Sequence, residues 1–310
     1  MFEVFIKMKT LVTARKHVKK LALSIFGIKR LRAIKYGYAI IPGEFSNVKK
    51  SINKVIEVCY STSNKDDQYW LGKLRQYAHI LDKGLNVKSF EVGRSKRYYD
   101  MALEAKDNIS NKDTREDESY IWAMRCIEEY EKKQNFPEIN VSLDFQNTTC
   151  SYQDIKNNIL TRRSVRQYKE KPLENDALAK ILDVVNWAPS SCNRQTAQAY
   201  AVTDPSIIQE CLKSCVGATC FDNYVPAFIT FCADIRPYDM PAEFYLPQID
   251  TSLGIQNCNL VANSLGVSIT LLSWASHSDI DEKKLRNHLN IPDYCEIIIN
   301  AVAGYPDLSG

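Results

Sequence analysis

Three arginines and a serine lie within a five-residue stretch, at Arg162, Arg163, Ser164 and Arg166. A guanidinium group is planar and permanently charged, and it can donate paired hydrogen bonds to a phosphate, to which a serine hydroxyl adds one more donor. This composition predicts a binding site for a phosphate or a similar anion. The alternative is a surface patch of ion pairs, which would need no ligand.

A small polar loop follows about one helix later in the chain. Its side chains are short or conformationally restricted, so that backbone N–H groups can approach a planar ligand closely. The candidate ligand-contacting residues are Pro189, Ser190, Ser191, Asn193 and Gln195. A proline-terminated helix end is the plain alternative, but it accounts for Pro189 alone. Cys192 is also part of this loop, and an inert thiol is the simpler interpretation of it.

These two motifs, in this order, resemble the FMN-dependent nitroreductase family. The resemblance continues at 250–257 and 260–267, which are similar to the family's long central helix and its end, and at 304–306, which is similar to the end of its last core strand. It covers residues 151–310, and residues 1–150 lie outside it. The fold that it implies is a three-layer α/β/α domain of the α+β class with a mainly antiparallel sheet.

The resemblance also implies how FMN is held. Arg162 and Arg166 would bind the phosphate and the ribityl or ring-edge oxygens, with Ser164 and Arg163 assisting. The polar loop would reach the flavin of the partner subunit, which makes the protein a homodimer with its flavin sites at the subunit interface. Other residues given a role by the resemblance are Asn257 on the central interface helix and Leu271 and Leu272 beside the flavin face.

The activity implied is transfer of hydride from NAD(P)H through the flavin to a small organic acceptor, which needs no dedicated catalytic acid or base. Basic residues are expected after the turn at 304–306, but Asp307 follows instead. Loss of one charge-assisted contact costs about 1.5–3 kcal/mol. Two alternatives therefore stay open: a flavin oxidase or dehydrogenase of a biosynthetic intermediate, and an accessory protein of surface-polysaccharide biosynthesis with little or no turnover.

Composition bounds the class of protein. A chain of 310 residues can form one large or two ordinary domains, and no apolar run is long enough to predict a membrane span. The first residues lack the features of a secretory signal. The ten cysteines show no metal-binding spacing, which favours free thiols and a cytoplasmic location.

Charge is unevenly distributed. Residues 1–50 contain twelve Lys and Arg and two acidic residues, a local charge of +10 in a chain whose net charge is +3. Apolar residues recur on one helical face between 7 and 34, so this leader could lie on an anionic membrane surface. A solvated basic helix is an equal alternative. No nucleic-acid partner is expected.

Periodicity predicts a basic amphipathic leader at 1–45, an all-α domain at 46–136, a linker at 137–150 that could run as an edge strand, and the FMN-binding domain at 151–310. The helices are expected at 46–60, 66–85, 95–108, 113–134, 151–161, 173–187, 205–215, 246–265 and 278–289. The strands are expected at 199–202, 227–233, 267–272 and 294–302.

One helical stretch of the N-terminal half carries several chemical side chains. Arg75, His79 and Lys83 or Asp82 share a face and could grip an anion or position a proton carrier. A structural role in a polar helix that ends at Gly84 is the favoured alternative. The stretch is similar to a helical extension of nitroreductase-like proteins found beside surface-glycan biosynthesis enzymes. Residues 221–226 and 236–241 are expected to form a substrate lid.

Overall fold

The computed structural model describes residues 53–54, 57–58, 65–87, 90–139, 148–215, 217–218, 221, 224–274 and 277–307. The leader at 1–45, most of the helix at 46–60 and most of the linker at 137–150 lie outside the described residues, so those predictions stay predictions. Residues Val48–Gly310 form one compact unit. Within it we distinguish a helical region, 65–136, and a layered region, 151–307.

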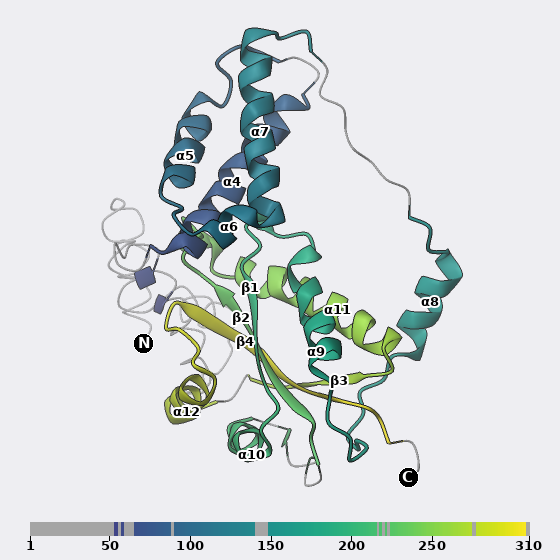
Figure 1. Ribbon diagram of the computed structural model, residues 1–310. Coiled ribbons are helices and arrows are strands. Elements are labelled where there is room, and N and C mark those ends of the chain that lie inside the picture. Colours follow the sequence, from purple (N-terminus) through teal and green to yellow (C-terminus); the bar gives the residue numbers. More distant parts are fainter. Residues whose placement is uncertain are drawn as a thin grey trace, which may run out of the picture. The chain divides into compact units, whose positions relative to one another are not determined.

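The layered region is built on one antiparallel sheet (Figure 1). Its strands are β1 (Ala197–Val202), β2 (Ala227–Asp234), β3 (Ser268–Leu272) and β4 (Cys295–Gly304), in the spatial order β1-β2-β4-β3. Every neighbouring pair is antiparallel. All eight residues of β2 are buried, because it lies inside the sheet and is covered on both faces.

Two pairs of helices cover the sheet (Figure 1). On one face α10 (Pro205–Lys213) and α12 (Asp279–Leu289) pack on alternate residues of the strands. On the other face α9 (Asn175–Asp183) and α11 (Leu246–Ser264) do so. The α+β fold with three layers, predicted from the resemblance, is confirmed.

Helix α11 is central and tightly packed. At Gly254 a Cβ atom would lie 2.0 Å from the carbonyl oxygen of Val185, so only glycine lets α11 approach the short 3-10 helix η1 (Val184–Trp187) this closely. The helix predicted at 173–187 is α9 followed by this 3-10 turn. The strand predicted at 294–302 extends two residues farther, to Gly304.

The helical region contains α4 (Asp67–Leu85), α5 (Lys96–Asp107), α6 (Lys112–Glu116) and α7 (Glu118–Asn135). The single helix predicted at 113–134 is divided, because Asp117 is extended and its carboxylate accepts a hydrogen bond from Ser119 N to begin α7. A separate core fills this region; its fully buried members include Leu74, Ala78, Leu81, Ala102, Ala105, Ile109 and Ala123.

A further helix, α8 (Tyr152–Thr161), precedes the arginines and has no buried residue. None of the helices in the described part of the chain is long and apolar enough to cross a membrane. The same residues contain no cluster of His, Cys, Asp and Glu that could hold a metal ion.

Candidate functional site

The arginine segment, residues 162–166, is held against the edge strand β3. Ser268 Oγ donates a hydrogen bond of 2.8 Å to the carbonyl of Arg163, and Thr270 Oγ1 donates one of 2.7 Å to the carbonyl of Val165. Tyr168 OH donates a third, of 2.9 Å, to the same Val165 carbonyl. Side chains of the sheet therefore fix the backbone that carries the arginines.

The charges of this segment are not neutralised by the described residues. Arg163 folds back, and its Nη1 donates to the carbonyls of Leu160 and Arg162, at 2.5 and 2.9 Å. Arg162 is half-buried, whereas Arg166 is exposed, and no described carboxylate forms an ion pair with either. The surface ion-pair alternative therefore finds no support in this part of the chain, and the segment is a cationic site open to an anion.

The polar loop, residues 189–195, has an unusual backbone. Cys192, Asn193 and Gln195 adopt φ values of 54°, 53° and 51°, in the left-handed region. For residues other than glycine this conformation costs about 1–2 kcal/mol each, less for Asn, and it persists only where the surroundings impose it. The contacts on either side of these residues show what imposes it.

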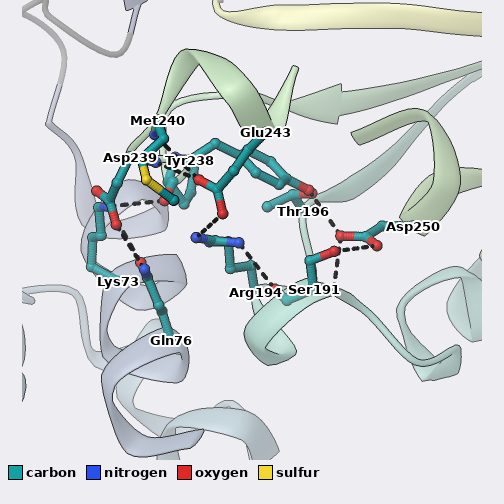
Figure 2. A network of polar contacts seen from close by, with 11 residues as sticks. Lys73, Gln76, Ser191, Arg194, Thr196, Tyr238, Asp239, Met240, Glu243 and Asp250 are labelled. Atoms are coloured by element: carbon teal, nitrogen blue, oxygen red, sulfur yellow. Dashed lines mark hydrogen bonds and ion pairs between the residues drawn. The ribbon is translucent and has the colours of Figure 1, made fainter. Parts of the chain in front are cut away.

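Asp250 of α11 holds the start of the loop (Figure 2). Its carboxylate accepts hydrogen bonds of 2.9 Å from both the backbone N and the Oγ of Ser191. Tyr238 OH donates to the same carboxylate at 3.0 Å and also contacts Thr196 Oγ1 at 2.9 Å. Burial, followed by the charge of Asp250, raises the pKa of Tyr238, so the hydroxyl stays a neutral donor.

Arg194 holds the end of the loop. Its side chain is only 2% exposed and forms an ion pair of 3.0 Å with Glu243. The guanidinium carbon lies 4.8 Å from the centre of the Tyr238 ring, a cation–π distance. Because Ser191 and Arg194 are both fixed, Cys192 and Asn193 between them have little conformational freedom. The strain is therefore maintained by buried polar contacts.

The two groups of predicted site residues lie at opposite ends of α11. Asp250, near its N-terminus, contacts the polar loop, and Asn263, near its C-terminus, donates hydrogen bonds of 2.7 Å to Asn158 Oδ1 and 3.0 Å to Thr161 Oγ1, next to the arginine segment. At 1.5 Å per residue the two ends are separated by about 20 Å along the helix axis. The arginine segment and the polar loop therefore lie apart in one chain, and we call them the two candidate half-sites.

The remaining predicted residues have different environments. Asn257 Nδ2 makes only a long contact, 3.5 Å, with the carbonyl of Val184. Leu271 is 42% exposed, whereas Leu272 is 2% exposed and belongs to the core beneath α12. Successive residues of a strand face opposite sides of the sheet, so only Leu271 of this pair is available to a ligand.

The anion grip considered on α4 is not formed by the described residues. Arg75 is 8% exposed; its Nε donates to Ser119 Oγ at 2.6 Å, and its Nη2 lies 3.5 Å from Asp117. This guanidinium therefore fastens α7 to α4. Burial and the charge of Lys83 lower the pKa of His79, which keeps its imidazole neutral near pH 7.

The segment 236–241, expected to be a substrate lid, is an anchored connection. Arg236 is 6% exposed and Tyr238 1%. Arg236 forms ion pairs with Asp234, at 2.6 Å, and with Asp66 at the start of α4, at 3.0 Å. The prediction of a lid at 236–241 is therefore wrong, because burial of both side chains fixes the segment between the two regions.

The sequence of this chain is similar to those of known proteins. A family model described as the nitroreductase family matches residues 159–219, which include both half-sites. A protein of Archaeoglobus fulgidus named "Putative NADH dehydrogenase/NAD(P)H nitroreductase" is 32% identical over 155 residues, covering 48% of this chain and 83% of that protein. The chain belongs to the nitroreductase family.

Two further proteins are similar to this chain. The NADPH-flavin oxidoreductase of Vibrio harveyi is 25% identical over 158 residues, 48% of this chain and 64% of that protein. The crystal structure of a nitroreductase with bound FMN from Bacteroides fragilis has a TM-score of 0.43 and 20% identity, covering 51% of this chain and 90% of that one. The helical region lies outside the residues matched by the nitroreductase family model.

The nitroreductase motifs visible in the sequence do not include the residues that support them. The motifs do not point to Arg194, Glu243 or Tyr238, and Asp250 falls only within the range that resembles the central helix. An arginine inside an otherwise small and uncharged loop is a usable signal, since a buried guanidinium needs a partner. Nothing in the sequence indicates that the partner is Glu243.

Proposed function

We propose that this protein is an FMN-dependent oxidoreductase that transfers hydride from NAD(P)H through the flavin to a small organic acceptor. The names of similar proteins, an NAD(P)H nitroreductase and an NADPH-flavin oxidoreductase, support this class of activity. The observation that carries the proposal is the arginine segment, whose cations have no described carboxylate partner and whose backbone is fixed on β3.

The donor set fits a flavin mononucleotide. Arg162 and Arg166 supply charge for the phosphate, and Ser164, exposed between them, supplies a hydroxyl. The exposed Leu271 lies on the strand beside this segment and offers an apolar contact to a ring. Ser190, Asn193 and Gln195 of the polar loop supply the hydroxyl and amides that suit the polar edge of an isoalloxazine.

FMN, when bound, accepts hydride from the nicotinamide and passes the electrons to the acceptor. The residues of the chain would bind and orient it: the arginines would hold the charged end, and the polar loop is held in one conformation by its own contacts with Asp250 and Glu243. Preorganised donors of this kind cost little to order on binding. No described side chain has to act as an acid or a base for this role.

We also propose that the working unit is a homodimer in which the polar loop of one copy meets the arginine segment of the other. The two ends of α11 that contact the half-sites are about 20 Å apart within one chain, too far for one small ring system to contact closely at both ends. Large apolar side chains are exposed on α8, η1 and α11. They are Tyr152 (75%), Ile155 (45%), Ile159 (48%), Leu160 (58%), Trp187 (67%), Ile249 (48%) and Leu253 (45%).

An apolar surface of this extent supports an interface between copies. On α11 Ile249 and Leu253 are one turn apart, so they form one stripe along the helix. A second copy related by a two-fold axis would present the same stripe in return, as in most homodimers. It would also bring each polar loop toward the partner's arginine segment.

The proposal is tested by an absorbance spectrum of the purified protein and by titration of FMN into the flavin-free form. We expect bound-flavin absorbance bands that NADH or NADPH bleaches, and reoxidation by a small acceptor such as a nitroaromatic compound or a quinone. A protein that takes up no FMN at high micromolar concentration would contradict the proposal. If the protein binds FMN but neither NADH nor NADPH reduces the bound flavin, FMN binding is supported and the proposed hydride transfer is contradicted.

Other predictions remain open beside this one. A cytoplasmic location, contact of the basic leader with an anionic membrane, and a link to surface-polysaccharide biosynthesis are tested neither by the structure nor by the comparisons. Sedimentation with anionic vesicles at low and high salt would test the membrane contact, because such binding falls as salt screens the charges.

A further inference from the structure

A continuous chain of polar contacts connects α4 of the helical region to the polar loop (Figure 2). It begins at Lys73, whose Nζ donates a hydrogen bond of 2.8 Å to the carbonyl of Pro237 and forms an ion pair with Asp239. Gln76, on the same face of α4, donates from Nε2 to the other carboxylate oxygen of Asp239 at 2.7 Å. Two side chains of α4 thus fix the carboxylate of Asp239.

Glu243 passes this constraint on to the loop. Its Oε2 accepts hydrogen bonds from the backbone N of Asp239, at 3.0 Å, and of Met240, at 3.2 Å. Its Oε1 accepts from Arg194 Nη2 at 3.0 Å. The carboxylate of Glu243 therefore joins the segment held by α4 to the arginine that fixes the end of the polar loop.

Direct packing accompanies the polar chain. A Cβ atom at Gly72 would lie 2.7 Å from Pro237 Cγ and 3.9 Å from the carbonyl oxygen of Arg194, so the backbone of α4 lies against both. Arg75 Nη1 also reaches the Arg194 carbonyl, at 3.4 Å. The polar loop is thus in contact with the helical region as well as with α11.

The stability of the fold gives no sufficient account of Lys73. It is only 3% exposed, and burial lowers its pKa although Asp239 acts in the opposite direction. Desolvation of a buried ammonium offsets most of what its ion pair contributes, so a well-packed apolar side chain of similar volume would serve stability equally well. An apolar side chain could not replace the positioning role of the ammonium, which fixes Asp239 and the Pro237 carbonyl relative to α4.

We propose that α4 positions the polar loop of the flavin site, with Lys73 and Gln76 acting through Asp239, Glu243 and Arg194. The inference rests on the proposed function. Lys73 and Gln76 are buried positioning residues and are not expected to touch a ligand. Their contacts maintain the left-handed backbone at Cys192 and Asn193, and with it the population of protein that is ready to bind. The helical region is then part of the flavin site rather than a separate attachment.

The test compares two lysine-to-methionine variants of the full chain. Lys73→Met removes the buried ammonium but keeps the volume, and it leaves Asp239, whose side chain is 48% exposed, able to hydrate. Lys96→Met makes the same change at an exposed ion pair with Asp100 on α5. FMN affinity is measured by quenching of flavin fluorescence, the environment of the bound ring by visible circular dichroism, and the Tm on the flavin-free protein.

For Lys73→Met we expect the Kd of FMN to rise about tenfold, because an apparent Kd scales inversely with the population of the competent conformation. The visible circular dichroism of the bound flavin should change, while the Tm stays within a few degrees of the wild type. Lys96→Met should behave as wild type in all three measurements.

Gln76→Met and Glu243→Gln extend the test along the same chain of contacts. Gln76→Met is an uncharged change that should raise the Kd in the same direction, so that the result does not depend on one variant. In the double variant Lys73→Met with Glu243→Gln, the rise in the Kd of FMN should be smaller than the product of the two single-variant fold-changes, because both substitutions break one pathway.

The outcomes separate this inference from the function on which it rests. If the wild type binds FMN and the Lys73 and Gln76 variants bind it as tightly as Lys96→Met does, the positioning role is wrong and the proposed function stands. A loss of Tm in Lys73→Met and Gln76→Met at unchanged FMN affinity would make the chain of contacts purely structural and would also overturn the inference. If the wild type itself binds no FMN, both fail.

Discussion

The two half-sites of this protein are built in opposite ways. The arginine segment has a backbone fixed by hydroxyls of the sheet but side chains that the described residues leave unneutralised. The polar loop carries almost no charge toward solvent, and its backbone is held in a costly conformation by buried ionic contacts at Asp250 and Arg194. The arginine segment supplies positive charge that attracts an anion, and the polar loop supplies a fixed backbone conformation.

This difference predicts how substitutions at each half-site should affect FMN binding and the stability of the fold. Removal of charge from the arginine segment should weaken binding without weakening the fold, because nothing in the described structure is built on those cations. Removal of a support that leaves buried donors without an acceptor, such as Asp250, should weaken both, because the same contacts hold the loop and join the elements around it. Substitutions at the two half-sites therefore distinguish the two designs.

The largest effect is expected from Arg162→Ala combined with Arg166→Ala. Each lost guanidinium contact with a phosphate costs about 1.5–3 kcal/mol, so the pair should lower FMN affinity by a factor of about 100 or more. The Tm of the flavin-free protein should be unchanged. Fluorescence titration and thermal unfolding give the two values. Lys156→Ala, which removes an exposed cation from α8, is the matched control and should leave FMN affinity nearly intact.

Asp250→Ala should produce the converse pattern. The substitution leaves Ser191 N and one hydrogen bond of Tyr238 OH without their acceptor. We expect the free energy of unfolding to fall by about 2–4 kcal/mol, the range for breaking a buried polar network. Urea unfolding measures it, and FMN affinity should fall as well. A variant with normal stability and weak FMN binding would show that Asp250 acts on the ligand rather than on the loop.

The smallest effect is expected far from both half-sites, at His277 and Glu282, whose Nε2 and Oε2 atoms lie 3.6 Å apart. The interaction with His277, opposed by burial and aided by hydrogen bonds from Arg286, lowers the pKa of Glu282 to about 2. Burial lowers the pKa of His277, but its ion pair with Glu282 and its hydrogen bond to the Trp274 carbonyl outweigh burial and raise it above 6.5.

The signs of these two contributions are opposite. Stability from Glu282 is present above its unfolded pKa near 4.5 and is lost as the pH falls toward 2. Stability from His277 is present below 6.5 and is lost as the pH rises through its folded value. Glu282→Gln should therefore flatten the acid side of the stability profile by about 1–2 kcal/mol after allowance for solvent screening. FMN affinity measured at pH 7 should not change; a change would mean that the half-sites are coupled to this distant pair.

Much of the fold could be predicted because local patterns and global packing agree. Alternating and helical periodicities indicated the four strands and most of the helices. Where a helix end was misjudged, as at Asp117, a capping carboxylate ended one helix and began the next, and a pattern of apolar residues does not report such a break. The resemblance supplied the antiparallel order, which no local pattern contains.

The half-sites were predictable to different degrees for a physical reason. The arginines lie side by side in the sequence, so their chemistry is visible without a structure. The supports of the polar loop come from residues far from it in the chain, such as Glu243 and Lys73, and only folding brings them together. Leu272 shows the same limit, since burial depends on which face of a strand is covered, and the sequence indicated only that both leucines are apolar.

The most direct test of the central claim is complementation between two defective chains. One carries Arg162→Ala and Arg166→Ala, and the other carries Ser190→Ala and Asn193→Ala in the polar loop. Each alone should show little flavin-dependent NAD(P)H oxidation. When equal amounts are unfolded and refolded together, a site shared between copies predicts that about one quarter of the wild-type sites are restored, one in each mixed dimer. If both half-sites of each flavin came from a single chain, every site would keep a defect and the mixture would stay inactive, which would contradict the account.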